Sequence, residues 1–282
     1  MKKFVLIALL AVMAVSVVGC KSDKTLVDIN GSDTMVNMGA ALAEDFMKTN
    51  KNIDIVVSGG GSGTGIAALI NGTTNIAQSS RDMKQTEKDQ ASVKGKLREI
   101  IVGWDGLVVV VHPANSVREL TLSQLAKIYR GEITNWQEVG GNDANIVLLS
   151  RDTTSGTYIF FKEFVVQENG KVKTAEFAPA TMMIPSTQSI VQEISRNANA
   201  IGYVGLGYLR PEIRALGIKG TDESAAVQPS VETVHNKTYD LARPLYFYTI
   251  GDLQGAVKTY VDYVLSDAGQ KVVRELGFVP IR

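Results

Sequence analysis

Short runs rich in β-branched residues alternate with amphipathic helical patterns along most of this chain. The strand-like runs are bounded by turn residues, and they lie at 26–30, 53–58, 75–79, 99–113 and 145–150. Between the first two of them, apolar residues recur at helical spacing at Met35, Met38, Leu42 and Phe46. Such alternation predicts an α/β fold with largely parallel sheets.

A further helix is predicted to begin after Thr121. Leu122, Leu125 and Ile128 are three apart along the chain. Thr121 and Gln124 are spaced as a capping box, in which each side chain bonds the other residue's backbone N–H.

The first 20 residues have the order of a secretory signal. Two lysines precede an uncharged apolar run, and a small residue precedes Cys20. The segment is too short for a comfortable membrane span, and Cys20 is the only cysteine, so it cannot form an intramolecular disulfide. The sequence VVGC at 17–20 resembles a bacterial lipobox, which implies a lipid-modified Cys20 and a domain tethered to the outer face of a membrane. The alternative is an ordinary signal peptide with a leftover thiol.

The charge balance gives no reason to expect nucleic acid or an anionic lipid surface as partner. Removing residues 1–19 lowers the Lys+Arg count from 29 to 27 against 29 Asp+Glu, so 27 − 29 leaves a net charge of −2. With 45% hydrophobic residues, the chain can bury the core of one large domain or two of ordinary size.

Three predicted strand-to-helix turns carry the same small and hydroxylated residues: GSDT at 31–34, GGGSGTG at 59–65 and SRDTTSGT at 150–157. A helix N-terminus presents free N–H groups and about half a positive charge, so it favours an anion. Arg151 adds a fork of donors suited to a tetrahedral oxyanion. Three such turns at one place would form a compact oxyanion site, although any single one is more simply a helix cap.

Several kinds of catalytic site find little support. The glycine run lacks the lysine of a P-loop and misses the GxGxxG spacing. Ser62 is not in a GxSxG elbow, because Thr64 stands where the last glycine would be. The two histidines, His112 and His235, are not near a candidate nucleophile in sequence, and no cluster of His or Cys suggests zinc. The sequence therefore predicts no catalytic residue, no metal and no cofactor.

The order of motifs resembles the phosphate-binding proteins of the phosphate-specific ABC transport system. The motifs span nearly all of the chain after Cys20, and they are GSDT, GGGSGTGIAALINGTTNIAQSSRDM, WDGLVVVVHPAN, LAKIYRGEITNW, SRDTTSGTYIFFKEF, NAIGYVGLGYL and LARPLYFYT. The resemblance implies a two-lobed periplasmic-binding-protein fold of type II with a ligand cleft between the lobes. It also implies a solute-binding protein that captures inorganic phosphate, presents it to an ABC permease and performs no chemistry on it.

The resemblance further implies a discontinuous first lobe of residues 24–105 plus 228–282, with a second lobe of residues 106–227. The apolar run 99–113, interrupted by Gly103, Asp105 and Gly106, looks like a strand that leaves one lobe for the other. A ligand that touches both lobes would stabilise the closed state. Tyr203 and Tyr208 are expected between the lobes or in the core.

Matching motif by motif, the resemblance implies that phosphate is bound by Ser32, Asp33, Thr34, Ser62, Ser80, Arg81, Asp82, Arg151, Ser155, Gly156 and Thr157. In the familiar pattern, an aspartate just after the NIAQS-like strand accepts a hydrogen bond from the protonated phosphate oxygen, but here Ser80 occupies that position. Asp33 and Asp82 are the candidate replacements, and Asp33 is favoured because it lies inside GSDT. The alternatives are a helix-capping Asp33 and a surface turn at Asp82. For Arg81, they are a solvated loop arginine or an ion pair with Asp82.

An acceptor carboxylate would favour the binding of phosphate over that of sulfate, which carries no proton near neutral pH. The difference in binding free energy would be on the order of a few kcal/mol. Three other functions stay open: a binding protein for sulfate, molybdate or another oxyanion, an enzyme acting on phosphate esters, and an adhesin or signalling subunit that reuses the fold. A monomer is the default expectation.

Overall fold

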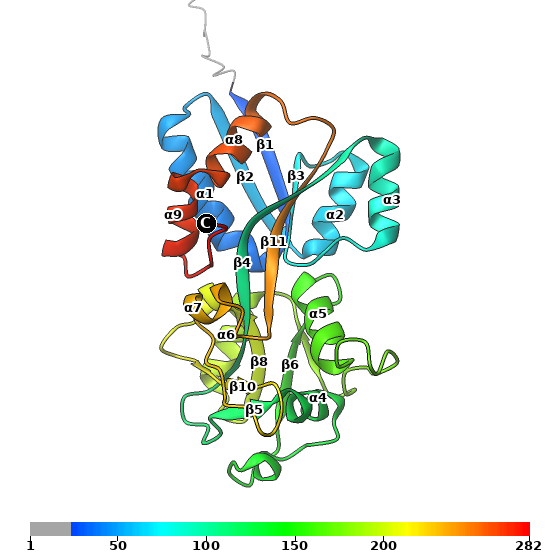
Figure 1. Cartoon of the computed structure of the whole chain (residues 1–282), viewed down its shortest axis with the longest axis vertical. Coiled ribbons are helices and arrows are strands. Elements are labelled where there is room, and N and C mark those ends of the chain that lie inside the picture. Colours follow the sequence, from blue (N-terminus) through cyan, green and yellow to red (C-terminus); the bar gives the residue numbers. More distant parts are fainter. Residues whose placement is uncertain (1–23) are drawn as a thin grey trace, which may run out of the picture.

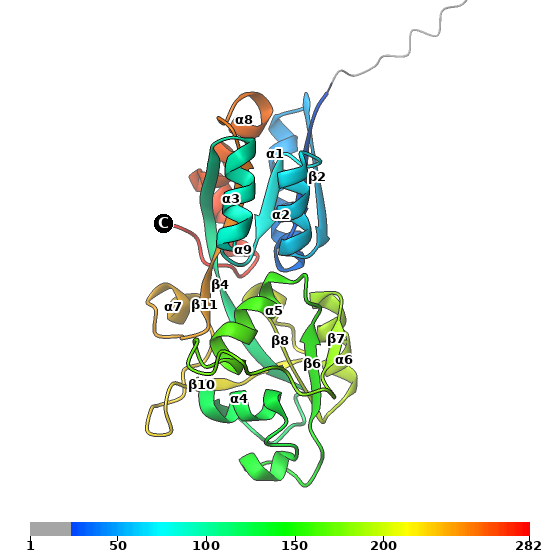
Figure 2. The ribbon, with the colours of Figure 1, turned by 90° about the vertical axis from the view of Figure 1, so that its right-hand side faces the viewer.

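The computed structural model describes residues 24–282, so the predicted signal segment 1–20 and the lipid-attachment residue Cys20 lie outside the described part. Figure 1 and Figure 2 show an elongated molecule of two lobes, which are joined by the long strands β4 (Leu97–Val111) and β11 (Ala242–Ile250). No helix within 24–282 is long and apolar enough to cross a membrane.

The first lobe, drawn at the top of Figure 1, is a sheet covered by helices on both faces. Its strands lie in the order β2 (Ile53–Gly60), β1 (Thr25–Gly31), β3 (Ile76–Ser79), β11 and β4. The pairs of β1 with β2 and β3 are parallel, whereas β11 is antiparallel to its neighbours. Its helices are α1 (Val36–Thr49), α2 (Ser62–Asn71), α3 (Gln85–Lys94), α8 (Gly255–Leu265) and α9 (Asp267–Glu275).

The two faces of this sheet have separate apolar cores. Helices α1, α8 and α9 pack around Phe46 and Phe247, while α2 and α3 cover the opposite face around Ile66 and Tyr248. Neighbouring residues of β11 point to opposite faces because side chains alternate along a strand. The predicted apolar stripe of α1 is confirmed, since Met38 and Leu42 are fully buried.

The second lobe is a smaller sheet that continues from β4. The end of β4 pairs with β8 (Ala200–Gly205), which is parallel to β6 (Val147–Arg151). The remaining elements of this lobe are β5 (Glu119–Thr121), β7 (Met182–Ile184), β9 (Arg214–Ala215), β10 (Gly217–Lys219), α4 (Leu122–Arg130), α5 (Gly156–Phe161), α6 (Thr187–Arg196) and α7 (Val231–His235). The predicted capping box of Thr121 and Gln124 is present at the start of α4.

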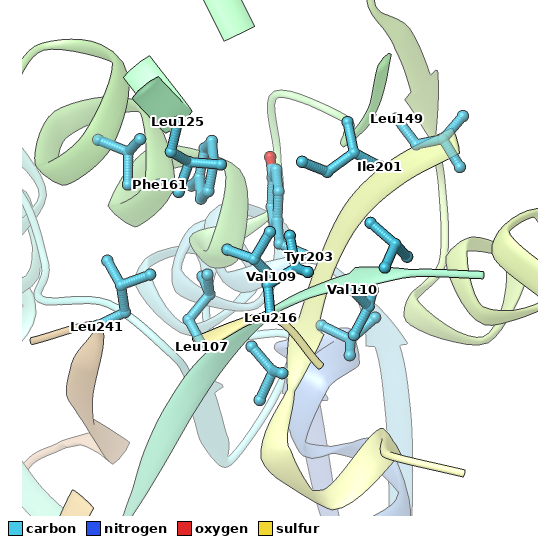
Figure 3. Close-up of a cluster of buried hydrophobic side chains, with 14 of the residues drawn as sticks. Leu107, Val109, Val110, Leu125, Leu149, Phe161, Ile201, Tyr203, Leu216 and Leu241 are labelled. Carbon is cyan, nitrogen blue, oxygen red and sulfur yellow. The ribbon is translucent and has the colours of Figure 1, made fainter. Parts of the chain in front are cut away.

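The core of the second lobe is shown in Figure 3, where Val109 of β4 lies near Phe161 and Tyr203. The rings of Phe161 and Tyr203 stack with centroids 4.0 Å apart. Tyr203 is therefore a core residue, which is one of the two places expected for it. Stacked aromatic pairs add to the stabilisation from buried area.

Strand β4 serves both lobes, and its pairing changes partner at Gly106. Residues 97–106 pair with β11, and residues 107–111 pair with β8. Val234, Tyr239 and Leu241 belong to the same apolar core as Leu107. The chain just before β11 thus packs with the second lobe, while the division of the chain at residues 105 and 228 stays a prediction.

Helix α2 packs against β1 so closely that only glycine fits at position 65. A Cβ atom on Gly65 would lie 2.3 Å from the carbonyl oxygen of Asn30 and 2.5 Å from the Cα atom of Gly31. Both are backbone atoms, so they cannot rotate away as a flexible side chain could. This contact fixes the distance between the start of α2 and the end of β1.

We expect Gly65→Ala to lower the free energy of unfolding by about 1–3 kcal/mol, because the added methyl group overpacks the interface of α2 with β1. Urea unfolding followed by circular dichroism measures the change. Ala67→Ser, on the exposed side of the same helix, is the control and should stay within about 0.5 kcal/mol of wild type. An equal effect of both substitutions would contradict the close-packing argument.

Candidate functional site

The three hydroxyl-rich turns lie together where the two lobes meet. The backbone N–H of Gly63, in the second turn, donates to the carbonyl oxygen of Thr154 in the third, at 3.0 Å. The Thr154 hydroxyl donates to the carbonyl oxygen of Gly60 at 3.2 Å. The first turn joins them because Gly61 N–H donates to the carbonyl oxygen of Gly31 at 2.9 Å. Each turn follows a strand and precedes a helical segment, as the sequence predicts.

Five buried hydroxyls, which we call the hydroxyl cluster, meet at this junction: Ser32, Thr34, Ser62, Ser80 and Thr157. The Ser32 hydroxyl donates to Ser80 Oγ at 2.8 Å, and Ser80 Oγ lies 3.5 Å from Ser62 Oγ. Across the lobes, Thr34 Oγ1 and Thr157 Oγ1 share a hydrogen bond of 2.7 Å. Because a hydroxyl both donates and accepts, each of these groups can turn its proton toward an anion.

Gly156 lets the lobes approach this closely. A Cβ atom at Gly156 would lie 2.3 Å from Ser62 Oγ and 2.9 Å from Ser80 Oγ. The neighbouring Ser155 caps α5, because its hydroxyl accepts hydrogen bonds from the backbone N–H groups of Thr157 and Tyr158. Gly156 thus lies against the hydroxyls of Ser62 and Ser80, whereas the Ser155 side chain caps the N-terminus of α5.

Arg151 is buried, and each nitrogen of its guanidinium group has a partner. Nε donates to the carbonyl oxygen of Ile184, Nη1 to the hydroxyl of Thr187 at 2.6 Å, and Nη2 to the carbonyl oxygen of Pro185 at 2.8 Å. Nη2 also lies 3.3 Å from the carboxylate of Asp33. These partners hold Arg151 against β7 and the start of α6.

Asp33 forms a link between the lobes. Its Oδ2 accepts a 2.7 Å hydrogen bond from the backbone N–H of Thr187, and its carbonyl oxygen accepts one from the Tyr208 hydroxyl at 3.0 Å. Burial, together with the Asp33 carboxylate, raises the pKa of Tyr208 well above its ordinary value, so the phenol stays a neutral donor. Asp33 therefore binds second-lobe groups, and its role as the phosphate acceptor stays a prediction.

The Arg81 side chain is held by a carboxylate of α3. The Arg81 guanidinium forms a bidentate ion pair with Glu87, at 2.7 and 2.8 Å, and donates to the carbonyl oxygen of Asp82. The Asp82 residue is exposed. The ion-pair partner of Arg81 is thus Glu87 and not the carboxylate of Asp82.

A buried ion pair between Arg243 and Asp105 lies beside the cluster. Neither residue was predicted from the sequence as a phosphate ligand. Arg243 Nη2 is 2.9 Å from Asp105 Oδ2 and also donates to Thr157 Oγ1 at 2.9 Å. Asp105 Oδ1 accepts from the backbone N–H of Leu206 at 3.0 Å. Burial raises the pKa of Asp105, while the Arg243 guanidinium acts in the opposite direction. An acidic residue inside the apolar run 99–113 is the sequence signal that could have identified this pair.

Comparisons with known proteins place the chain in a family. Residues 20–268 match the family model described as a PBP superfamily domain. The phosphate-binding protein PstS of Borreliella burgdorferi is 31% identical, and the match covers 93% of each chain. The chain belongs to the phosphate-binding proteins of the PBP superfamily.

Two further similarities agree with this membership. Protein SphX of Synechococcus elongatus is 35% identical over 92% of this chain and 79% of that protein. A Clostridium perfringens structure, described as a candidate phosphate ABC transporter substrate-binding protein with bound phosphate, has a TM-score of 0.81 and 31% identity over 92% of this chain and 100% of that one. The predicted two-lobed α/β fold is thereby confirmed.

We expect Glu87→Gln to lower the free energy of unfolding at pH 7 by about 1–3 kcal/mol, because it removes a charge-assisted bidentate pair. Although partial burial acts to raise it, the hydrogen bonds from Arg81 and from the Lys84 backbone lower the pKa of Glu87 below its ordinary 4.5. A carboxyl group whose pKa is lower in the folded state stabilises the fold at pH values above its pKa in the unfolded chain. This stabilisation is lost as the pH falls through its pKa in the folded state.

The difference between wild type and Glu87→Gln should therefore shrink from pH 7 to pH 3, as measured by urea unfolding at each pH. Glu275→Gln removes an exposed pair with Lys271 at 3.8 Å and should change stability by less than about 0.5 kcal/mol at either pH. A Glu87→Gln penalty of the same size at both pH values would show that the ion pair is not its source.

Proposed function

We propose that this protein captures inorganic phosphate between its two lobes and delivers it to an ABC permease. One observation carries the proposal. Buried hydroxyls from both lobes meet at the Thr34–Thr157 contact, 2.7 Å apart, in a member of the phosphate-binding family. A tetrahedral oxyanion needs several converging donors, and hydroxyls beside helix starts supply them.

Binding would work by exchange of hydrogen bonds. The hydroxyls of the cluster bond one another, and a phosphate placed among them would replace these bonds with stronger ones to its charged oxygens. Because donors come from both lobes, phosphate binds the closed arrangement better than the open one and shifts the population toward it. The Asp33 contacts with Thr187 and Arg151 also form only when the lobes are together.

The proposed contacts of phosphate are the hydroxyl cluster, Gly156 and the first backbone N–H groups of α2. Asp33 is our candidate acceptor of the phosphate proton, and its position in the chain between Ser32 and Thr34 of the cluster supports this role. If it acts in this way, sulfate would be bound more weakly because it has no proton to donate. An equal affinity for sulfate would favour a general oxyanion carrier.

We also propose that the protein is exported, anchored through a lipid on Cys20, and monomeric. The signal-like order of residues 1–20 and the VVGC motif support the anchor. A purely binding function is supported by the family to which the chain belongs. Purified protein should therefore not turn over a chromogenic phosphomonoester, and turnover would favour the enzyme alternative.

We expect Thr34→Val to raise the dissociation constant for phosphate about 10- to 100-fold, because it removes one hydroxyl contact to a charged ligand while keeping the side-chain shape. Isothermal titration calorimetry of a form beginning after Cys20, stripped of bound anion, measures the constant. Thr249→Val is the matched control, since Thr249 is also buried but its hydroxyl has no hydrogen-bond partner within 24–282. Wild-type protein that binds no phosphate would contradict the proposed function.

A further inference from the structure

Gln78 of β3 bonds both backbone groups of Ser32, the first residue of the hydroxyl cluster. The N–H of Ser32 donates to the backbone carbonyl oxygen of Gln78 at 2.7 Å. In the opposite direction, the side-chain nitrogen Nε2 of Gln78 donates to the carbonyl oxygen of Ser32 at 3.1 Å. The same nitrogen also reaches the carbonyl oxygen of Ser58 in β2, at 3.5 Å. One side-chain amide thus ties the first turn to the strands on either side of β1.

Two glycines leave room for this arrangement. A Cβ atom on Gly31, whose φ is +140°, would lie 2.2 Å from the backbone carbonyl oxygen of Gln78. A Cβ atom on Gly39, inside α1, would lie 2.9 Å from Gln78 Oε1. Glycine inside a helix is destabilising relative to alanine. The space that the amide needs explains why glycine stands at position 39.

The apolar core by itself does not call for an amide at this position. Gln78 is 0% exposed, and it follows the buried apolar residues Ile76 and Ala77 of β3. Its Oε1 is buried and has no hydrogen-bond partner among residues 24–282. A buried amide oxygen without a partner is costly, and an apolar side chain of the same shape in its place is often neutral or stabilising. An amide kept at this cost points to a role other than stabilising the core.

We propose that Gln78 is a positioning residue of the oxyanion site, which holds the first turn where its hydroxyls meet the anion. This inference rests on the proposed function. The Ser32 side chain bonds Ser80 Oγ at 2.8 Å, and Thr34, two residues further on, reaches Thr157 in the other lobe at 2.7 Å. A shift of the turn would move both hydroxyls at once, and hydrogen bonds weaken steeply as their geometry departs from the ideal.

The same turn carries contacts that the first lobe makes with the second. Asp33 Oδ2 accepts from the backbone N–H of Thr187, and the Asp33 carbonyl oxygen accepts from the Tyr208 hydroxyl. Asp33 directly follows Ser32, whose two backbone groups Gln78 holds. Gln78 therefore also places the groups from which the closed arrangement is built.

Gln78→Met tests the inference, because methionine has a similar length but no donor. Calorimetric titration of the form beginning after Cys20, stripped of bound anion, should show a dissociation constant for phosphate raised about 10-fold. The urea midpoint should not fall, because loss of the unpartnered Oε1 offsets loss of the Nε2 bonds. The Ser32 carbonyl oxygen also keeps a hydrogen bond from the N–H of Met35 at 3.0 Å. A merely structural role would lower the midpoint and leave the affinity unchanged.

Gln270→Met is the matched control. Gln270 is also a buried glutamine of the first lobe, and its Nε2 donates to the carbonyl oxygens of Val102 and Val264. Its Oε1 accepts from the backbone N–H of Ile281, so every polar group of this amide has a partner. Gln270→Met should therefore lower the urea midpoint and leave phosphate affinity unchanged, which is the opposite of the pattern expected for Gln78→Met.

Gly39→Ala displaces the amide without removing it. The added methyl group would meet Gln78 Oε1 at 2.9 Å, while alanine has the higher helix propensity, so α1 is retained. The dissociation constant for phosphate should rise, by less than in Gln78→Met. In NMR spectra of 15N-labelled, ligand-free Gln78→Met, the backbone amide signals of residues 32–34 should broaden relative to wild type, and saturating phosphate should sharpen them.

The outcomes separate this inference from the proposed function. Wild-type protein that binds phosphate, with Gln78→Met binding it equally well, would overturn the inference and leave the function standing. If Gln78→Met does not fold, equal binding by Gly39→Ala would have the same meaning. Wild-type protein that binds sulfate but not phosphate would overturn the function, and sulfate binding weakened by Gln78→Met would still support the inference.

Discussion

The ion pair of Asp105 with Arg243 is the interaction on which the arrangement of the two lobes depends. Two charges without water are costly unless further hydrogen bonds satisfy them. Here the carboxylate is satisfied by Arg243 on one oxygen and by the backbone of Leu206 on the other. The pair joins β4 to β11 at the point where β4 enters the second lobe. The turns that form the candidate site are placed relative to this crossing.

The contact between the lobes is made chiefly by small residues and hydroxyls. Gly61 and Gly156 approach Thr154 and Ser62 so closely that a Cβ atom on either would collide with them. Such a surface gains little from apolar burial, so its closure depends on hydrogen bonds that a ligand can replace. Each lobe instead has its own apolar core, as Figure 3 shows for the second lobe. This separation allows the lobes to move without disturbing either core.

Much of the fold followed from local pattern, whereas the candidate site followed only in part. Helix α1 and strand β4 were predictable because apolar periodicity is a property of neighbouring residues. The convergence of the three turns was anticipated from their shared chemistry. The ion pair of Arg81 with Glu87 was not predicted, although Glu87 is only six residues away. Asp82 is closer in the sequence and carries the same charge, so it was considered as the partner instead. Separation along the chain does not determine which carboxylate a guanidinium group pairs with.

The sequence by itself determined the alternation of strands and helices, the hydroxyl-rich turns and the presence of arginines able to bind an oxyanion. Only the tertiary structure decided how those arginines are used. Arg151 is bonded to groups 33 to 36 residues away, and Arg243 to an aspartate 138 residues away. The reason is physical: a donor's availability depends on which acceptors the fold brings within about 3 Å. Acceptors that far along the chain carry no local pattern.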